Sequence, residues 1–476
     1  MARRSSTRAL NLSDGEIERA GRLLTEFLRG LEKSLPTRPV LPPLDRAVLS
    51  QILGEGFPET GIGVDGLFDE IVEKVVPNST MIAHPRFLAY VQGPPNGIAP
   101  FAEAIASALN QNCNIWQLSP AASIIEQRVI SWMAELFGYP ASAGGIMTSG
   151  GSIATLVALV TALHDRGKLD FRKTGLQSST APRILYTSAE SHRSVEKDAV
   201  ILGLGLDNVR KIPVDGAFRM RVDLLEDALR ADRRAGRVPF CVVATAGTVN
   251  TGAIDPIEEL ASFCSNEELW LHVDGAYGAF FILSERMRDA LFACGRADSV
   301  TLDPHKLLFA PIEAGCLIVR ERDKLKSTFG FSASYIPQGQ DTLMTDFMDY
   351  GPQLSRGFKA FKVWCALRAF GTSAFEAAAE RVLDIARYLG EKIEADPSLE
   401  LLAPVALSAV CFRLRGADDA GNRRILADLV EEGTALLGPV SINGRFGMRA
   451  CVTNFRTTRE DVDLILRRLT QIQRFR

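Results

Sequence analysis

The 476-residue sequence lacks any run of about 18 or more apolar residues, so we expect no membrane-spanning helix. It also lacks an excess of either charge, because 54 basic and 57 acidic residues give a formal net charge of −3. This balance disfavours nucleic acid or an acidic membrane surface as a partner. Internal repeats and low-complexity segments are missing too. We therefore expect a globular protein whose partner is a small molecule.

Paired cysteines are also missing. The eight cysteines are scattered singly, with no C-x-x-C pair and no cluster with histidine at metal-ligand spacing. This pattern predicts no bound metal and suits a reducing compartment. The basic start MARRSSTRAL is followed by no apolar segment of signal-peptide length. The expected location is the cytoplasm.

Short β-branched segments alternate with helical ones in the middle of the chain. This alternation predicts an α/β protein with a mostly parallel central sheet, covered on both faces by helices. In such sheets, ligands bind beyond the carboxyl ends of the strands. Strands are expected at residues 183–189, 209–214, 240–246, 269–276, 299–303 and 315–320, and helices at 152–167, 192–205 and 221–236.

Three domains are expected. Residues 1–88 form an N-terminal arm for packing or dimerisation, in which residues 12–33 have the apolar spacing of an amphipathic helix. Residues 89–360 form a large α/β domain, and residues 361–476 form a small α+β domain.

Two segments have the composition of loops. The proline-rich residues 35–46 predict an extended connector. Residues 329–341 are rich in glycine and serine and predict a mobile loop.

The stretch TSGGSIATL, residues 148–156, runs from Gly150 and Gly151 into a predicted helix, with Ser152 in its first turn. Free amide groups at a helix start bind phosphate, so these residues are candidates for a phosphate site. Close packing of a strand against a helix is the alternative explanation.

Three further residues follow predicted strands. Asp274 in LHVDGAYG and Lys306 in LDPHKLL are separated by about one βαβ unit of roughly 30 residues, which can bring both to the same sheet edge. His192 lies at another transition from strand to helix. Taken singly, the aspartate and histidine could be caps and the lysine a surface residue. Together with the phosphate site, they predict a phosphorylated pyridine aldehyde held by a lysine imine.

The motifs DPHK, HVDGAYG, ATAGTVNTGAIDP and SAESHRSVEKDA occur in this order and resemble those of the group II pyridoxal-phosphate-dependent amino-acid decarboxylases. That family includes aromatic-amino-acid, glutamate, histidine and diaminobutyrate decarboxylases. The resemblance extends from residue 84 to beyond residue 416. It implies pyridoxal 5′-phosphate as the cofactor and the aspartate aminotransferase-like fold type I. It also implies a homodimer with active sites at the interface and an N-terminal arm that wraps the partner.

Carried over to this sequence, the resemblance makes Lys306 the imine-forming lysine and Asp274 the partner of the pyridine nitrogen. His192 would stack on one face of the ring and Ala276 would pack on the other. The residues implied for the phosphate are Gly150, Gly151, Ser152 and His305.

Two positions depart from the family pattern. Asp303 stands where many relatives have asparagine, and its carboxylate would repel a phosphate dianion unless it turns away. Val249 replaces a threonine that is common in relatives, which removes one polar contact near the reacting centre.

For the substrate, the resemblance implies that Arg356 binds a carboxylate, although a basic residue on a helix surface is the alternative. Tyr335 would protonate the α-carbon after CO2 leaves, in place of the phenylalanine of aldehyde-forming relatives. The residues expected to border the substrate side chain are Tyr90, Val91 and Gln92, together with Asn112 and Asn114 in a segment donated by the partner subunit.

The predicted reaction is decarboxylation of an L-amino acid to its amine, with an aromatic and an acidic or polar substrate both open. Asn112 and Asn114 favour a polar substrate, whereas WQLSPAAS and CFRLRG look more like the aromatic branch. The alternatives are an aminotransferase, an aldehyde-forming relative, a carbon–carbon lyase of the same fold, and a non-catalytic protein that holds the cofactor.

Overall fold

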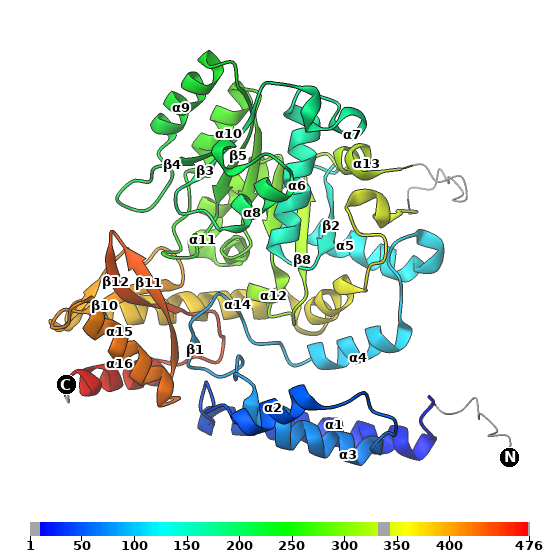
Figure 1. The fold of residues 1–476 in the computed structure, drawn as a ribbon, viewed down its shortest axis with the longest axis vertical. Helices are drawn as coiled ribbons and strands as arrows, with labels where there is room; N and C mark the ends of the chain where they lie inside the picture. The colour runs from blue at the N-terminus through cyan, green and yellow to red at the C-terminus, as the bar shows by residue number, and fades with distance from the viewer. Residues whose placement is uncertain (1–9, 332–342, 475–476) are drawn as a thin grey trace.

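The computed structural model describes residues 10–331 and 343–474. Its described residues form a large central sheet with helices around it, a smaller sheet near the C-terminus and a separate layer of N-terminal helices (Figure 1). Most of the predicted mobile loop at residues 329–341, Tyr335 included, lies outside the described residues.

The central sheet has seven strands in the order β2-β8-β7-β6-β5-β3-β4. Five of them run parallel from β4 to β7, and β8 is antiparallel to both of its neighbours. The predicted mostly parallel sheet is therefore confirmed. The strands are β2 (Gly144–Thr148), β3 (Arg183–Ser188), β4 (Val209–Ile212), β5 (Val238–Thr245), β6 (Trp270–Asp274), β7 (Ser299–Leu302) and β8 (Gly315–Val319).

The reversed direction of β8 follows from the short connection before it. Between β7 and β8 the chain forms only the one-turn helix α12 (Pro304–Leu307) and a loop. This connection is at the lower limit of the dozen or so residues that a crossover to a parallel neighbour needs, and its single helical turn is much shorter than a usual crossover helix. The chain therefore turns back at the edge where the parallel strands end, and Lys306 stays there.

Helices cover the sheet because their apolar faces meet strands that are buried throughout. α6 (Gly151–Arg166) packs across β5 to β8, and α8 (Ser194–Ile201) packs against α6. The helix predicted at 192–205 is shorter than expected, because Gly203 and Gly205 adopt left-handed φ angles of 74° and 80° that end it. Other helices are α5 (Pro120–Leu136), α7 (Phe171–Thr174), α9 (Val222–Arg234), α10 (Ile257–Asn266), α11 (Glu285–Phe292) and α13 (Asp323–Phe329).

The small sheet has the order β1-β11-β12-β10-β9. The long helix α14 (Lys359–Ala395) leads into it and changes direction at Gly371, whose φ is 71°. The first strand, β1, comes from a segment that precedes the central sheet in the chain, so the small sheet combines an early segment with late ones. The remaining elements are β1 (Phe87–Leu88), β9 (Leu399–Leu401), β10 (Ala409–Leu414), β11 (Leu436–Ile442), β12 (Arg445–Cys451), α15 (Asp419–Glu431) and α16 (Arg459–Arg474).

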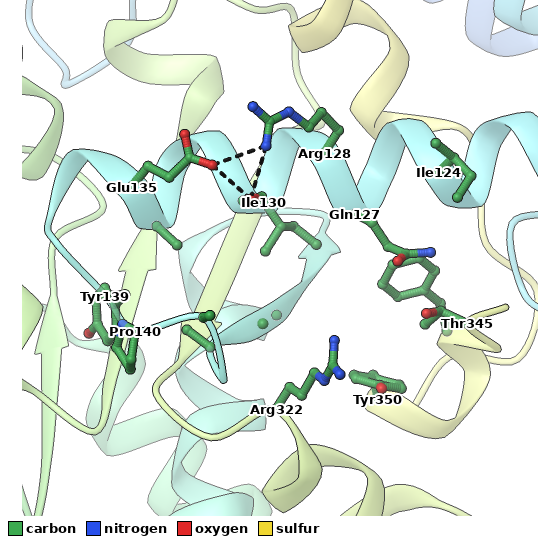
Figure 2. A pocket seen from close by; sticks show the side chains of 17 residues that line it. Ile124, Gln127, Arg128, Ile130, Glu135, Tyr139, Pro140, Arg322, Thr345 and Tyr350 are labelled. Carbon is green, nitrogen blue, oxygen red and sulfur yellow. Dashed lines mark hydrogen bonds and ion pairs between the residues drawn. The ribbon is translucent and has the colours of Figure 1, made fainter. Parts of the chain in front are cut away.

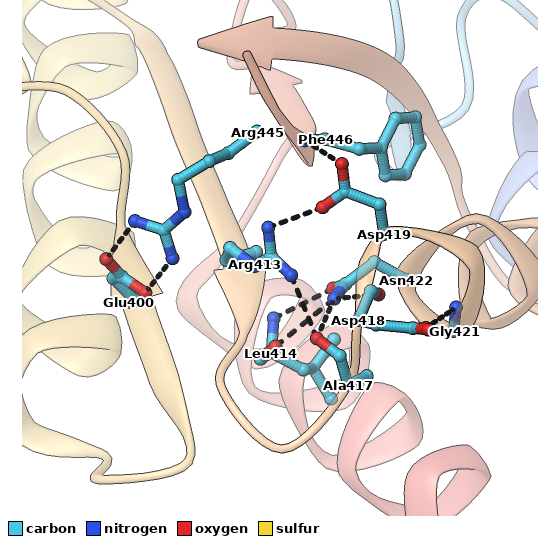
Figure 3. Close-up of polar contacts among 10 residues, drawn as sticks. All are labelled: Glu400, Arg413, Leu414, Ala417, Asp418, Asp419, Gly421, Asn422, Arg445 and Phe446. Carbon is cyan, nitrogen blue, oxygen red and sulfur yellow. Dashed lines mark hydrogen bonds and ion pairs between the residues drawn. The ribbon is translucent and has the colours of Figure 1, made fainter. Parts of the chain in front are cut away.

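Polar contacts fix α15 against this sheet (Figure 3). The fully buried Asn422 accepts the backbone N–H of Leu414 and donates to its carbonyl, at 2.9 and 3.2 Å. Asp418 caps the helix by accepting the N–H of Gly421 at 2.7 Å. These contacts satisfy backbone groups at the start of α15 and at the end of β10, so they hold the helix start against the sheet.

The N-terminal layer consists of α1 (Asp14–Ser34), α2 (Arg46–Gly54) and α3 (Gly63–Glu70), none of which contains a fully buried residue. α1 begins in a capping box, and its bounds confirm the helix predicted at 12–33. The predicted connector starts with a single 3₁₀ turn and is otherwise irregular up to α2. α4 (Ala99–Leu109) follows this layer along the chain. Over the described residues, no helix combines the length and apolarity that crossing a bilayer requires.

Candidate active site

A cavity of about 370 Å³ lies where several parallel strands end and α6 begins. Side chains reach it from separate loops at the same sheet edge, as expected for an open α/β sheet. The structure brings together in its lining all nine residues predicted to bind the cofactor. They are Gly150, Gly151, Ser152, His192, Asp274, Ala276, Asp303, His305 and Lys306.

Lys306 lies in the one-turn helix α12 directly after β7. Its Nζ is 2.9 Å from Oδ2 of Asp303, and its side chain is 21% exposed. The lysine is therefore neither a solvated surface residue nor fully buried. Its amine borders the cavity, where a bound aldehyde can reach it.

Asp274 is the last residue of β6 and pairs in register with Thr301 of β7. Its Oδ1 accepts the backbone N–H of Ala276 at 3.2 Å. Burial raises the pKa of this carboxyl, while the charges of Lys306 and His192 oppose that rise. A further cation in the cavity, such as a protonated pyridine nitrogen, would favour the ionised form of Asp274. An ionised Asp274 can then pair with that nitrogen.

His192 lies in the turn between β3 and α8. Its Nδ1 accepts the backbone N–H of Ser194 at 3.2 Å and lies 2.8 Å from that serine's Oγ. Burial lowers the pKa of His192, and the nearby Asp274 opposes the shift. The lowered pKa favours the neutral imidazole, and the two contacts of Nδ1 with Ser194 hold the ring in one orientation, which suits a group that stacks on a flat ring.

The space around Gly150 and Gly151 at the start of α6 shows whether the cavity fits a phosphorylated ring. A Cβ at Gly151 would lie 3.0 Å from Cβ of Ala276 and 3.1 Å from Oδ2 of Asp303, and a Cβ at Gly150 would lie 3.3 Å from His305. The backbone is therefore free to approach a ligand only because side chains are missing at these two positions. The open amides, the amine and the buried carboxylate together fit pyridoxal phosphate.

Sequence reasoning missed several residues of the lining. Thr245 ends β5, and its buried hydroxyl has no hydrogen-bond partner among the described residues. The rule that ligands bind at strand ends could have identified it, because β5 was predicted at 240–246. Ser149 lies within the quoted glycine-rich stretch. The further lining residues that were not predicted are Ile153, Ser194, Gly247, Tyr277, Ile312 and Glu313. Val249, which the sequence placed near the reacting centre, also lines the cavity.

The residues predicted for the substrate side chain do not line this cavity in the single chain. Tyr90 is 58% exposed, and Asn112 accepts the backbone N–H of Arg356 at 3.0 Å. Asn114 accepts the backbone N–H of Ile115 at 2.8 Å. Val91 and Gln92 are partly buried. The amide oxygens of both asparagines thus accept backbone N–H groups, and their amide nitrogens remain as donors.

Arg356 also lies outside the cavity lining. Its side chain is 1% exposed, pairs with Glu126 and donates to the backbone carbonyls of Cys113 and Met147 at 2.7 and 2.9 Å. The guanidinium is thus committed to the protein core, so these contacts do not support the predicted substrate contact. They also overturn the alternative of a surface arginine.

We expect Arg356→Met to lower the free energy of unfolding by about 3–5 kcal/mol, because it leaves Glu126 buried without a counter-charge. Chemical denaturation measures this loss. The double variant Arg356→Met/Glu126→Gln should recover part of it. A stable Arg356→Met protein with a raised KM would instead indicate a substrate-binding role.

Asp198 lies one helical turn after Ser194 on α8 and is fully buried, and its Oδ2 has no partner among the described residues. Burial raises its pKa to about 7, and the charge of Asp274 adds to the shift. The folded protein therefore holds a proton here that the unfolded chain loses above about pH 4. The proton on Asp198 contributes its full stabilisation of the folded state below pH 4, and this contribution is lost as the pH rises through 7.

We therefore expect Asp198→Asn to raise the free energy of unfolding by about 2–4 kcal/mol at pH 8 and to change it little at pH 4. Urea unfolding at the two pH values measures the difference. An equal effect at both values would show that the ionisation of Asp198 is not its cause.

A second and larger cavity, of about 590 Å³, lies between α5, β2 and the segment around Tyr350 (Figure 2). Gln127, Arg322 and Thr345 point toward it, and an ion pair between Arg128 and Glu135 runs along α5. Its described lining contains no lysine, aspartate or histidine. Size alone therefore does not locate the chemistry, and the smaller cavity is the candidate active site.

The fold and the side chains around the smaller cavity define a class: an α/β protein of fold type I whose cavity fits pyridoxal phosphate. In residues 10–331 and 343–474, no group of three or more histidine, cysteine or carboxylate side chains could hold a metal ion.

Residues 48–415 match the family model described as the pyridoxal-dependent decarboxylase conserved domain. The chain is 33% identical over 469 residues to an aromatic-L-amino-acid decarboxylase of Bacillus atrophaeus, covering 97% of this chain and 96% of that protein. It is 34% identical to an L-2,4-diaminobutyrate decarboxylase of Rhizobium meliloti strain 1021, covering 86% and 82%. A crystal structure of Oryza sativa TDC with PLP and tryptamine superposes with a TM-score of 0.90 at 26% identity, covering 97% and 99%.

The chain therefore belongs to the pyridoxal-dependent decarboxylase family. It is a decarboxylase of amino acids, and its cofactor is pyridoxal 5′-phosphate.

Proposed function

We propose that this chain decarboxylates an L-amino acid in the cavity around Lys306, whose amine joins the aldehyde carbon of the cofactor. The observation that supports this location most strongly is that Lys306, Asp274, His192 and the start of α6 line one cavity. In the proposal, Asp274 keeps the pyridine nitrogen protonated and His192 lies on one face of the ring. Ser152 and the amides at Gly150 and Gly151 hold the phosphate.

When bound, pyridoxal phosphate supplies a ring that accepts the electron pair left on the α-carbon as CO2 departs. The protein selects which bond breaks by holding the substrate carboxylate out of the plane of the ring. Because Arg356 is bound in the core, we assign this orientation to groups that line the cavity. Thr245, with a buried hydroxyl that lacks a partner among the described residues, is the first candidate.

A screen of the 20 protein amino acids, diaminobutyrate and dihydroxyphenylalanine for CO2 release tests the reaction and identifies the substrate. We expect a small subset to yield CO2 and the matching amine. A keto acid formed from amino donors without CO2 would contradict the proposal and would support the aminotransferase alternative.

Two substrate classes are consistent with the residues near the predicted substrate position. Asn112 and Asn114 retain amide donors that favour a polar or acidic side chain. Two relatives with nearly the same sequence identity to this chain, 33% and 34%, are named as decarboxylases of aromatic L-amino acids and of L-2,4-diaminobutyrate. Asn112→Leu separates the two classes, because it should raise KM for a polar substrate and leave KM for an aromatic one nearly unchanged.

We further propose that the protein is a homodimer with its active sites at the interface. Large apolar side chains are concentrated at the surface of the N-terminal layer and of α4, as shown by Leu53, Phe57 and Ile105, which are 88, 96 and 50% exposed. A single chain leaves this surface in water, and a second copy would bury it.

Sedimentation analysis of Leu53→Asp tests the dimer, with Leu206→Asp as a control, because Leu206 is 54% exposed outside this layer. We expect only the first variant to dissociate. Mixed dimers of Lys306→Ala and Asn112→Leu test whether the sites are shared. Partial recovery of activity would support donation of Asn112 by the partner, and no recovery would contradict it.

Tyr335 lies outside the described residues, and its role in protonating the α-carbon remains a prediction. Tyr335→Phe should slow release of the amine and raise the yield of aldehyde and ammonia. Product analysis by mass spectrometry measures the ratio. Unchanged amine turnover would remove Tyr335 from the mechanism.

We also propose a cytoplasmic location. All eight cysteines lie in the described part of the chain and are free, which suits a reducing compartment. Fractionation of cells that express the full chain tests this location.

A further inference from the structure

The cavity of about 590 Å³ lies at an edge of the central sheet (Figure 2). Its edge strand, β2, pairs with β8 on one side. On the other side, the backbone N–H of Met147 donates to Oε1 of Glu126 at 2.9 Å, and its C=O accepts a hydrogen bond from Arg356 at 2.9 Å. These two side chains bind the outer groups of β2 as a neighbouring strand would.

Gly145 lies two residues before Met147 and has no such partners. Every second residue of a strand turns its main-chain groups to the same side, so the N–H and C=O of Gly145 also face away from β8. Gly145 is buried and lines the cavity, and neither group is hydrogen-bonded on this side by a described residue. Because buried main-chain groups are nearly always paired, this wall presents a donor and an acceptor to a ligand.

Two side chains beside Gly145 add further polar groups. Arg322 points toward Tyr350, and its guanidinium forms no ion pair among the described residues (Figure 2). Burial raises the pKa of Tyr350, so its hydroxyl keeps its proton at pH 7 and can donate. Arg128 and Glu135 neutralise each other at 3.0 Å. Arg322 is therefore the one uncompensated charge in the described lining, which favours a ligand with a single negative charge.

The shape of the cavity depends on two glycines. A Cβ at Gly145 would overlap the carbonyl oxygen of Leu317, and a Cβ at Gly144 would lie 2.6 Å from Cβ of Arg322. Side chains at these positions would displace the strand or the arginine. Apolar parts of the wall come from Ile130, Ala134 and Phe347. The volume lies in the range of pockets that hold small organic molecules.

We propose that this cavity binds a small N-acylated amino acid with an apolar side chain. Its amide N–H donates to the C=O of Gly145, and its carboxylate accepts from the N–H of Gly145 and pairs with Arg322. Tyr350 donates to the same carboxylate, and the apolar side chain packs on Phe347. The ligand thus bonds to β2 as the last residue of an added strand would. This site is separate from the cavity around Lys306 and does not depend on the proposed reaction.

Calorimetric titration of the full-length holoenzyme with N-acetyl-L-leucine tests the proposal. This probe has no free amine and cannot react with the cofactor aldehyde, so the heat reports binding alone. We expect one molecule per chain with a Kd of roughly 0.1–1 mM. N-acetyl-L-leucinamide lacks the charge and should bind at least about tenfold more weakly. 4-Methylpentanoate lacks the amide and should bind roughly fivefold more weakly.

Variants locate the bound probe. Arg322→Met should weaken binding of N-acetyl-L-leucine at least about tenfold, and Tyr350→Phe roughly threefold. Arg230→Met removes a paired arginine of α9 that is 56% exposed, and it should behave as wild type.

Two results would overturn the proposal: no binding at about 10 mM probe, which lies well above the expected Kd, or equal affinity in wild type and Arg322→Met. If Arg322→Met does not fold, the probes decide with wild-type protein. Tighter binding of the acid than of the amide then supports the proposal, and equal binding overturns it.

Discussion

Lys306→Ala is expected to abolish amine formation, with kcat/KM falling by roughly 10³-fold or more, in the range that loss of a covalent nucleophile costs. The amine of Lys306 borders the cavity at 2.9 Å from Asp303, and no other lysine lines that cavity among the described residues. The visible absorbance of the bound cofactor should disappear after dialysis, because nothing else holds the aldehyde covalently.

Two variants control for charge and for general effects of substitution. Lys306→Arg keeps the positive charge beside Asp303 but cannot join the aldehyde, so it should be as inactive as the alanine variant. Lys173→Ala removes a lysine that is 82% exposed and should behave as wild type. A visible band that persists in Lys306→Ala after dialysis would contradict the assignment.

Asp274→Asn is expected to have the second largest effect, a loss of roughly 10²–10³-fold in kcat, comparable with removal of one preorganised electrostatic group. The carboxylate is buried and its Oδ1 is held by the N–H of Ala276, so it is fixed in place before the cofactor binds. An asparagine keeps the shape but does not keep the pyridine nitrogen protonated. Weaker electron withdrawal by the ring then raises the barrier to loss of CO2.

Asp274→Glu is the matched variant, since it retains the charge and shifts it by one methylene. It should recover part of the lost activity and of the cofactor affinity. Steady-state kinetics and titration of pyridoxal phosphate measure the two effects. A kcat for Asp274→Asn within threefold of wild type would show that this carboxylate does not act on the ring.

The part of the site that could be predicted from sequence is the part that follows from local rules. Lys306, Asp274 and His192 each come directly after a strand-like segment, and parallel strands bring such ends to one edge. Gly150 and Gly151 indicate a helix N-terminus whose backbone N–H groups are free to bind an anion. These residues need no knowledge of remote contacts, and the structure places all of them around one cavity.

Arg356 could not be placed from sequence, because its environment is made by residues far from it in the chain. Glu126 on α5 and Met147 on β2 lie more than 200 positions away, and β2 itself was not predicted. A charged residue with buried partners cannot be told from an exposed one by its neighbours in sequence alone. The antiparallel direction of β8 was likewise not predicted. The short connection between β7 and β8 already favours an antiparallel neighbour over a parallel one.

Borohydride reduction of the purified protein, followed by digestion and peptide mass mapping, tests the central claim most directly. Reduction fixes the bond between the cofactor and its lysine, so the label identifies that residue. We predict a single labelled peptide that contains Lys306. A label on another lysine, or no label in protein that still shows the cofactor absorbance, would contradict this account.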